Sequence, residues 1–184
     1  MTSQNDKKKN ARVLLRLVYS ALCLALAIAL PQLVGRVPEL GKLISPMHLP
    51  TYLAGLIVGP LWGLLVGAIA PMLNFFLYGR PVFTSAFAMV FELGGYAFFT
   101  GLCYRLLPKK PSSVYLAVGA GMVLGRVLGG VGKVVLLFGG MLESYSLAAF
   151  WSGYFASGTV AMLVTLALVP VVFLALRRAH LTLS

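Results

Sequence analysis

The stretch VFTSAFAMVFELGGYAFFTGLCYRLL, residues 82–107, decides how this chain can fold. It is about as long as the hydrocarbon core of a bilayer is thick, and it carries a carboxylate, Glu92, well inside its apolar sequence. An ionised side chain at that depth is costly, so it must face a bundle interior or a wet cavity. The stretch therefore predicts a membrane-spanning helix whose acid has a partner or a function. The other charges deep in apolar segments are Arg126 and Lys133.

The composition of the whole chain agrees with a protein that lies in the membrane. Its 184 residues are 60% hydrophobic and 10% charged, which leaves too few polar side chains to cover a soluble globule. A net charge of +11 would suggest nucleic acid in a soluble protein, but most basic residues here flank apolar runs. We therefore expect a lipid bilayer and no nucleic acid as partner. Cys23 and Cys103 lie inside apolar runs and are expected to be packed thiols, with no disulfide and no metal site.

The apolar segments predict an all-α integral membrane protein, a compact bundle of six spanning helices. Residues 1–12 form a basic cytoplasmic tail, residues 13–178 the transmembrane substrate-binding domain, and residues 179–184 a C-terminal tail. The first helix runs from about 13 to 34, ends or kinks near Pro31, and lacks a signal-peptide cleavage site, so it is expected to be retained. The other helices are predicted at about 49–58, 61–78, 82–107, 114–138 and 147–176.

The basic residues predict the orientation of this bundle. With the N-terminus inside, most of them fall on the cytoplasmic side, where Lys and Arg are normally in excess. Both termini are therefore expected to be cytoplasmic. The inside set is Lys7, Lys8, Lys9, Arg12, Arg16, Arg105, Lys109, Lys110, Arg177 and Arg178, and the outside set is Arg36, Lys42 and Arg80.

The depths of the polar side chains predict a binding cavity in the outer half of the bundle. Glu92 and Arg126 both fall near the midplane and are expected to pair directly across the bundle. Lys133 lies further out on the same face as Arg126, where a small anionic or polar molecule would bind first. The candidate substrate-binding residues are Lys133, Arg126, Glu92, Asn74, His48, Tyr96, Trp151 and Tyr154.

Several candidates have a plainer interpretation that the sequence leaves open. Trp151 and Tyr154 suit the aromatic belt at a membrane interface, and Asn74 suits a hydrogen bond between helices. His48 suits a solvated loop, and Lys133 has a stem long enough to reach the surface.

Sequence motifs for catalysis do not compete with binding. The chain has no Walker-type glycine loop, no metal-ligand cluster and no nucleophile elbow, and His48 and His180 are expected on opposite sides of the membrane. It also lacks two similar halves, which argues against a self-contained transporter with inverted repeats. We expect a protein that is not an enzyme. The alternatives are an independent facilitator or channel, and a membrane enzyme or assembly factor that uses Glu92.

Small residues recur every four positions on the first helix, at Ala21, Ala25 and Ala29. Such a stripe lets another helix approach closely, either within the chain or from a partner.

Together these features resemble the substrate-binding S components of energy-coupling-factor (ECF) vitamin transporters. The likeness extends over nearly the whole chain: six helices, the alanine stripe, and the run PMHLPTYLAGLIVGPLWGLLVGAIAPMLNFFLYGRPVF followed by AMVFELGGYAFFTGLCYRLLPKK. It implies a multi-pass subunit of a bacterial or archaeal cell membrane that captures a water-soluble vitamin from outside. It also implies docking through the alanine stripe on a transmembrane coupling subunit driven by two cytosolic ATPases, followed by toppling to release the cargo.

The resemblance implies no cofactor in this chain, since the partner ATPases use the ATP. Members of the family recognise different vitamins, and the local pattern looks closest to pantothenate carriers or to pyridoxine and hydroxymethylpyrimidine carriers. Lys133 and Arg126 suit the carboxylate of pantothenate. The chain lacks the acidic cluster that a cobalt or nickel carrier would favour.

Overall fold

The computed structural model describes residues 2–35, 46–156, 158–179 and 181–182, and within them it is helical throughout, without strands. The elements are α1 (Thr2–Val34), α3 (His48–Val58), α4 (Pro60–Tyr78), α5 (Phe83–Leu106), α6 (Pro111–Phe138), α7 (Leu147–Trp151), the π-helical turn η1 (Ser152–Ala156) and α8 (Thr159–Arg178).

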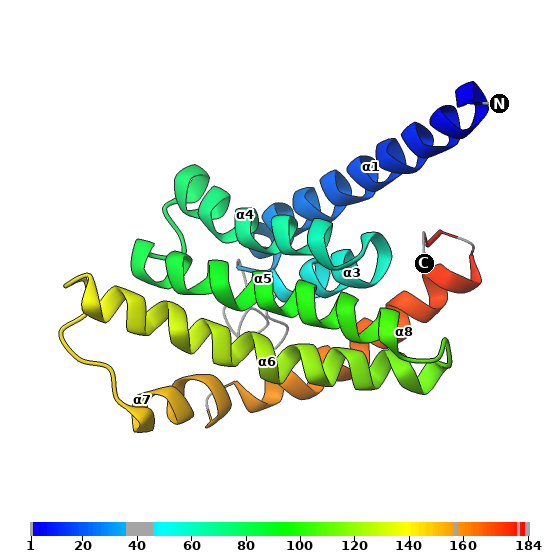
Figure 1. Ribbon diagram of the computed structural model, residues 1–184. Coiled ribbons are helices and arrows are strands. Elements are labelled where there is room, and N and C mark those ends of the chain that lie inside the picture. The colour runs from blue at the N-terminus through cyan, green and yellow to red at the C-terminus, as the bar shows by residue number, and fades with distance from the viewer. Residues whose placement is uncertain (1, 36–45, 157, 180, 183–184) are drawn as a thin grey trace.

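The bundle has the composition of a membrane protein, as predicted. Its described residues contain five helices that are long and apolar enough to cross a bilayer, together with the shorter apolar helix α3. Figure 1 shows α5 between α4 and α6, with α1 running out to the N-terminus beyond the bundle. The two chain ends lie toward the same end of the bundle. That this end is cytoplasmic stays a prediction from the charge bias, and Arg36, Lys42 and His180 lie outside the described residues.

Glycines bring α5 into close contact with its neighbours on both sides. A Cβ at Gly67 of α4 would lie 2.4 Å from the carbonyl oxygen of Leu93, and one at Gly125 of α6 would lie 2.3 Å from Cδ1 of Tyr96. Helices in lipid associate largely through such close packing, since lipid tails are as apolar as the side chains. The glycine-rich sequence of α6 is therefore compatible with a long helix.

The predicted break between the second and third helices is confirmed at Gly59. This residue has φ +99°, a left-handed conformation that favours glycine, and Pro60 starts α4. Gly101 of α5 packs against the same junction, because a Cβ there would lie 2.5 Å from the carbonyl oxygen of Gly55.

The N-terminal tail differs from its prediction. Residues 1–12 were predicted to be a tail that precedes the first helix, but α1 begins at Thr2 and Pro31 lies inside it. The segment contains three consecutive Lys and single Gln, Ala and Arg residues, and neither Gly nor Pro. Once the apolar part is helical, adding such residues costs little. The cytoplasmic location of this segment stays a prediction.

The predicted sixth helix, 147–176, is not continuous. It divides into α7, the π-helical turn η1 and α8. Gly153 and Gly158 lie in or beside the interruption, and glycine is a weak helix former. A π-helical turn holds an extra residue, so the side chains on either side of it face a different direction than in an uninterrupted helix.

Candidate functional site

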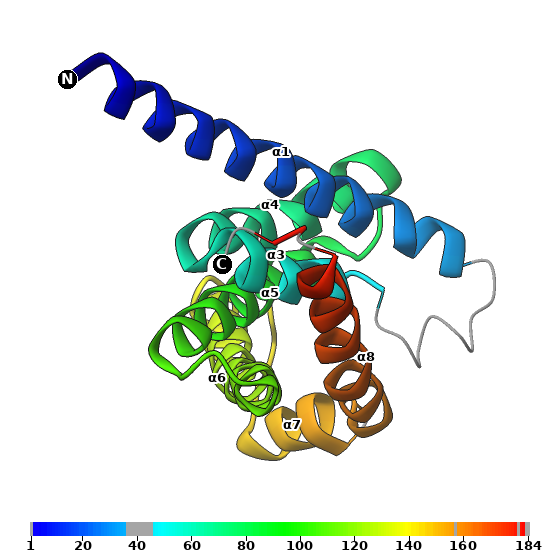
Figure 2. The same ribbon diagram turned by 90° about the vertical axis from the view of Figure 1, so that its right-hand side faces the viewer.

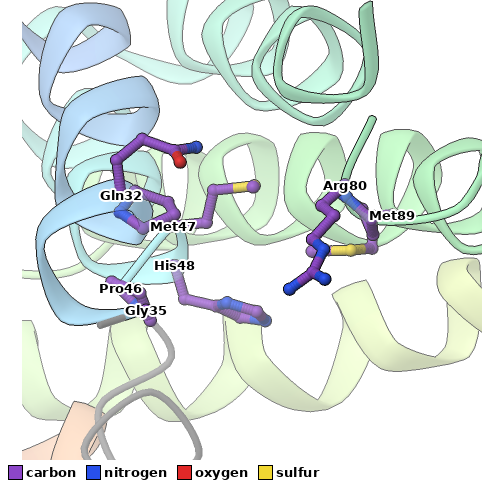
Figure 3. Close-up of a pocket in the computed structure, with 9 residues that line it drawn as sticks. Gln32, Gly35, Pro46, Met47, His48, Arg80 and Met89 are labelled. Atoms are coloured by element: carbon purple, nitrogen blue, oxygen red, sulfur yellow. The ribbon is translucent and has the colours of Figure 1, made fainter. Parts of the chain in front are cut away.

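Three neighbouring cavities occupy the half of the bundle away from the chain ends. The first has a volume of about 500 Å³ and is lined by Gln32 of α1, His48 of α3, Arg80 after α4 and Met89 of α5. Figure 3 shows the His48 imidazole and the Arg80 guanidinium extending toward each other from opposite sides of this space. The first cavity therefore has basic groups on two walls.

The second and third cavities continue from the first. The second, of about 170 Å³, is lined by Glu92, Lys133 and Tyr154, and it shares Met89 with the first. The third, of about 220 Å³, is lined by Tyr145 and shares Ser85 and Lys133 with the second. Glu92 and Lys133 thus face the same small cavity, although their sequence depths placed them at different levels.

The direct Glu92–Arg126 pair predicted from the sequence is wrong. The Tyr96 hydroxyl donates a hydrogen bond to Oε1 of Glu92 and accepts one from Nε of Arg126 at 3.2 Å. Within the described residues, Glu92 and Arg126 form no ion pair with each other. The phenol ring of Tyr96, fully buried against Gly125, fills the space in which the two charges would otherwise meet.

The basic group in contact with Glu92 is His48, at the start of α3. Its Nε2 lies 3.9 Å from Oε1 of Glu92, and its ring centroid lies 5.4 Å from that of Tyr96. Tyr52, one turn further along α3, also stacks on Tyr96, and the centroids of these two rings lie 4.9 Å apart. His48 thus belongs to a buried cluster rather than to a solvated loop, and it connects this cluster with the first cavity.

Lys133 lies among aromatic rings beside the second cavity. Its Nζ is 5.2 Å from the ring centroid of Tyr154 and 5.5 Å from that of Tyr145. A cation at such distances is attracted to the ring faces. In the loop between α6 and α7, partial burial raises the pKa of Tyr145, and the negative charge of Glu92 adds to this effect. Tyr145 is therefore a neutral hydroxyl at pH 7.

Some of the buried polar atoms without partners belong to the walls of these cavities, His48 in the first and Tyr145 in the third, and Arg126 is linked to the second through Tyr96 and Glu92. Nη1 of Arg126, Nδ1 of His48 and the hydroxyl of Tyr145 have no hydrogen-bond partner in the part of the chain that the structure describes. Such atoms are rare in folded proteins, and each one requires an explanation. A bound polar molecule would supply partners to this group.

Asn74 and Trp151 line none of these three cavities, although Oδ1 of Asn74 accepts a hydrogen bond at 3.4 Å from Nε2 of Gln32 in the wall of the first. Asn74 is fully buried and donates hydrogen bonds to the carbonyl oxygens of Ala27 at 3.2 Å and Ala70 at 3.0 Å. The Asn74 side chain therefore joins α1 to α4, as its plainer interpretation predicted. Trp151 is 57% exposed on α7 and packs on Phe155, at a centroid distance of 4.8 Å.

The sequence interpretation missed several residues of the site. Ser85 and Met89 precede Glu92 and Tyr96 at helical spacing on one face of α5, and this periodicity was a usable signal. Tyr52, Arg80 and Tyr145 had no such signal, because their positions depend on how α3 and two connecting segments fold back on the bundle.

The alanine stripe is exposed. Ala21, Ala25 and Ala29 all face outward, whereas Cys23 and Ala27 are buried against the bundle. Residues two positions apart on a helix point about 200° apart, so the stripe lies opposite the buried face of α1. It does not serve packing within the described part of this chain.

Comparison with known proteins identifies the family. The family model described as "ECF transporter, substrate-specific component" matches residues 15–181. Comparisons with curated proteins and with solved structures give no match. The matched region covers most of the chain, including every residue that lines the three cavities. The chain therefore belongs to the substrate-specific components of ECF transporters, which are multi-pass transport subunits of the cell membrane and not enzymes.

Proposed function

We propose that this subunit binds a water-soluble vitamin or vitamin precursor with a carboxylate, of the pantothenate type, in the three cavities. The observation that carries the proposal is the unpaired state of Nη1 of Arg126, a residue only 7% exposed. Arg126 is linked through the Tyr96 hydroxyl to Glu92, which lines the same cavity as Lys133. A buried cationic donor without a partner is costly, and a ligand carboxylate would satisfy it with a charge-assisted hydrogen bond.

The size and polarity of the cavities support a small polar ligand. The first cavity, at about 500 Å³, lies within the range of small-molecule sites. The proposed ligand places its carboxylate near Lys133 and Arg126, and its hydroxyl and amide groups near Glu92 and His48. Its entry is through the first cavity, between His48 and Arg80.

The decisive measurement combines identification of the ligand with a charge deletion. Mass spectrometry of the small molecule that co-purifies with the protein in mild detergent identifies the vitamin, and calorimetry then measures its affinity. Lys133→Ala should weaken binding by roughly 10- to 100-fold, because it removes a charge-assisted contact. Lys110→Ala, a matched change at the other end of the bundle, should leave the affinity unchanged. Saturable binding that survives Lys133→Ala at full affinity would remove Lys133 from the site.

A vitamin with an aromatic ring, such as pyridoxine or hydroxymethylpyrimidine, is the second candidate. The rings of Tyr52, Tyr96 and His48 form a stack that supports this candidate. His48 is the partly exposed ring of the stack, so an aromatic ligand could pack on it. Such a ligand would lose affinity in His48→Ala and little in Lys133→Ala, so the two variants separate the candidates.

We also propose that the exposed alanine stripe contacts the transmembrane coupling subunit of the ECF module. Two cytosolic ATPases would drive that module, so this chain needs no cofactor of its own. The solute would be captured on the outer side and released inside after docking. The flat, outward-facing stripe supports this assignment, because small residues allow a partner helix to approach closely.

A further inference from the structure

A basic pocket lies at the end of the bundle near the chain ends, far from the three cavities. It has a volume of about 350 Å³ and is lined by Arg16 of α1, Arg105 of α5 and Lys109 of the loop after α5. Figure 2 looks onto this end, where α3 lies between α1 and the end of α8. The proposed vitamin site does not use this pocket.

The cations around the pocket are held in place by specific contacts. Nζ of Lys109 lies 3.8 Å from the ring centroid of Tyr104 and donates to the Tyr104 carbonyl oxygen at 3.0 Å. Arg177 of α8 donates from Nη1 to the carbonyl oxygen of Lys109 at 3.1 Å. Partial burial lowers the pKa of Lys109, and the charges of Arg177 and Arg105 lower it further. The pocket therefore has a strongly positive potential.

The chain offers no acid to neutralise these cations in the part that the structure describes. Asp6, Glu92 and Glu143 are its described acids, and none lines the pocket. Asp6 lies about 15 Å from Arg16 along α1, which is too far for the Asp6 carboxylate to pair with the cations of the pocket. An anion from outside the chain is thus the natural counter-charge.

The floor of the pocket is backbone at the α3–α4 break. The guanidinium of Arg105 lies against Gly59, where a Cβ would come 2.7 Å from its Nη2. The last residues of α3 and Gly101 of α5 form the rest of this floor. A side chain at position 59 would displace the Arg105 guanidinium from this wall of the pocket.

An apolar groove continues from this pocket along α1. The groove has a volume of about 460 Å³ and shares Ile57 with the basic pocket. On α1 it extends from Leu15, next to Arg16, to Leu26, a rise of about 16 Å, or roughly half the thickness of the hydrocarbon core. Its other walls are Leu53 of α3 and Leu176 of α8.

We propose that the basic pocket and the groove together bind one anionic phospholipid of the surrounding bilayer. The phosphate lies among Arg16, Arg105 and Lys109, and one acyl chain follows the groove through a single leaflet. Basic pockets between membrane helices recognise lipid headgroups by this chemistry. A free phosphate would fill only the basic pocket. An acidic protein segment would bind in the basic pocket but would not fill an apolar groove as long as one leaflet of the bilayer is thick. The proposal is independent of the identity of the vitamin.

The test measures lipid preference in the purified full-length chain. Native mass spectrometry and thermal unfolding are followed while dioleoylphosphatidylglycerol or dioleoylphosphatidylcholine is added in mild detergent, with inorganic phosphate as a separate arm. The wild-type chain should bind the anionic lipid on the order of tenfold more tightly than the zwitterionic one. Arg105→Gln with Lys109→Gln should abolish this preference. The control variant, Lys110→Gln with Arg178→Gln, removes two positive charges from the same end of the bundle but outside the pocket. It should keep the preference for the anionic lipid.

Four results would overturn the proposal. The first two are equal binding of the two lipids by the wild-type chain, and an equal loss of lipid preference in both double variants. The third is stabilisation by inorganic phosphate to the same extent as by the anionic lipid, and the fourth is an Arg105→Gln, Lys109→Gln variant that still binds the lipid but no longer associates with the coupling module. The last would assign the basic residues to a protein partner. Unchanged vitamin affinity in both double variants reports that they remain folded, so failure here is distinct from failure of the proposed vitamin site.

Discussion

Tyr96 is the residue on which the two buried charges of the site depend. Its hydroxyl donates to Glu92 and accepts from Arg126, so it relays a favourable interaction between groups that do not touch. A direct buried ion pair must repay the desolvation of both charges, and it does so only with good geometry and further hydrogen bonds. The phenol supplies one such bond to each charge while its ring packs between α5 and α6.

This role predicts a specific effect of Tyr96→Phe. The ring remains, but Glu92 and Arg126 each lose a buried hydrogen bond, so stability should fall by about 1–3 kcal/mol. Thermal unfolding in detergent measures the change. Tyr52→Phe is the matched control, because its ring is equally buried in the same stack and its hydroxyl makes no hydrogen bond within the described residues. Equal Tm values for Tyr96→Phe and wild type would show that the relay adds no stability.

The close contact between Gly125 and the ring of Tyr96 leads to a second prediction. A Cβ at this position would lie 2.3 Å from Cδ1 and 2.8 Å from the backbone nitrogen of Tyr96, so Gly125→Ala must separate α5 from α6. Overpacking of this kind costs about 1–3 kcal/mol, and it should also weaken vitamin binding. Thermal unfolding and calorimetry measure the two effects.

Gly119→Ala, on the same helix, is the control. A Cβ there would meet only Cδ1 of Leu166 at 4.0 Å, so alanine should stabilise the helix by roughly 0.5–1 kcal/mol. A Gly125→Ala protein as stable as Gly119→Ala would contradict the close packing of Tyr96.

The sequence predicted the buried charges but not how they meet. Hydropathy alone makes Glu92, Arg126 and Lys133 conspicuous, because a charge inside an apolar segment is rare. The intervening Tyr96 and the approach of His48 depend on the distance between helices and on where α3 begins. The helical rise per residue predicts how deep a side chain lies in the membrane. It does not predict where that side chain lies in the plane of the membrane, and so not which side chains it contacts.

At the scale of elements, α1 has one buried face and one exposed face. Cys23 and Ala27 pack against the bundle, and Asn74 of α4 donates to the carbonyl oxygen of Ala27. Ala21, Ala25 and Ala29 lie on the opposite, exposed face. The helix can therefore bind a partner without disturbing the packing that holds it to the chain.

This separation predicts that Ala25→Trp abolishes association with the coupling module and leaves vitamin affinity unchanged. An indole on the flat stripe prevents close helix approach, yet it lies far from the cavities and from the buried face. Co-purification with the ECF module and calorimetry measure the two properties. Leu26→Trp places the same ring about 100° around the helix and should preserve association. If Ala25→Trp still associates, the stripe is not the interface.

The interruption of the sixth helix shows the limit of prediction for elements. The boundaries of α3, α4, α5 and α6 follow from Pro and Gly positions and from the apolar runs, and the sequence predicted them closely. The segment 147–176 is apolar enough for one helix, but η1 interrupts it. Aromatic contacts between Tyr154, Phe155 and the cations of α6 accompany the interruption, and local propensity contains no information about them.

At the scale of the whole molecule, the binding cavities and the basic pocket lie at different ends of a closed bundle. Tyr52, Tyr96 and Thr100 are fully buried between them. At the next level Gly55 lies against Gly101, at backbone contact. Among the described residues, the packing therefore provides a site that is closed toward the chain ends and offers no evident path through the bundle.

This closure predicts the behaviour of the chain in vesicles. Vesicles that contain only this chain should bind the vitamin but not accumulate it, because the proposed release on the other side depends on docking to a coupling module that ATP drives. Adding the ECF module with ATP should produce uptake, and Ala25→Trp should block that uptake while retaining binding. Radiolabelled vitamin inside the vesicles is the quantity measured. Saturable accumulation by the chain alone would instead indicate an independent facilitator. It would also require a path that opens where Gly55 and Gly101 now meet.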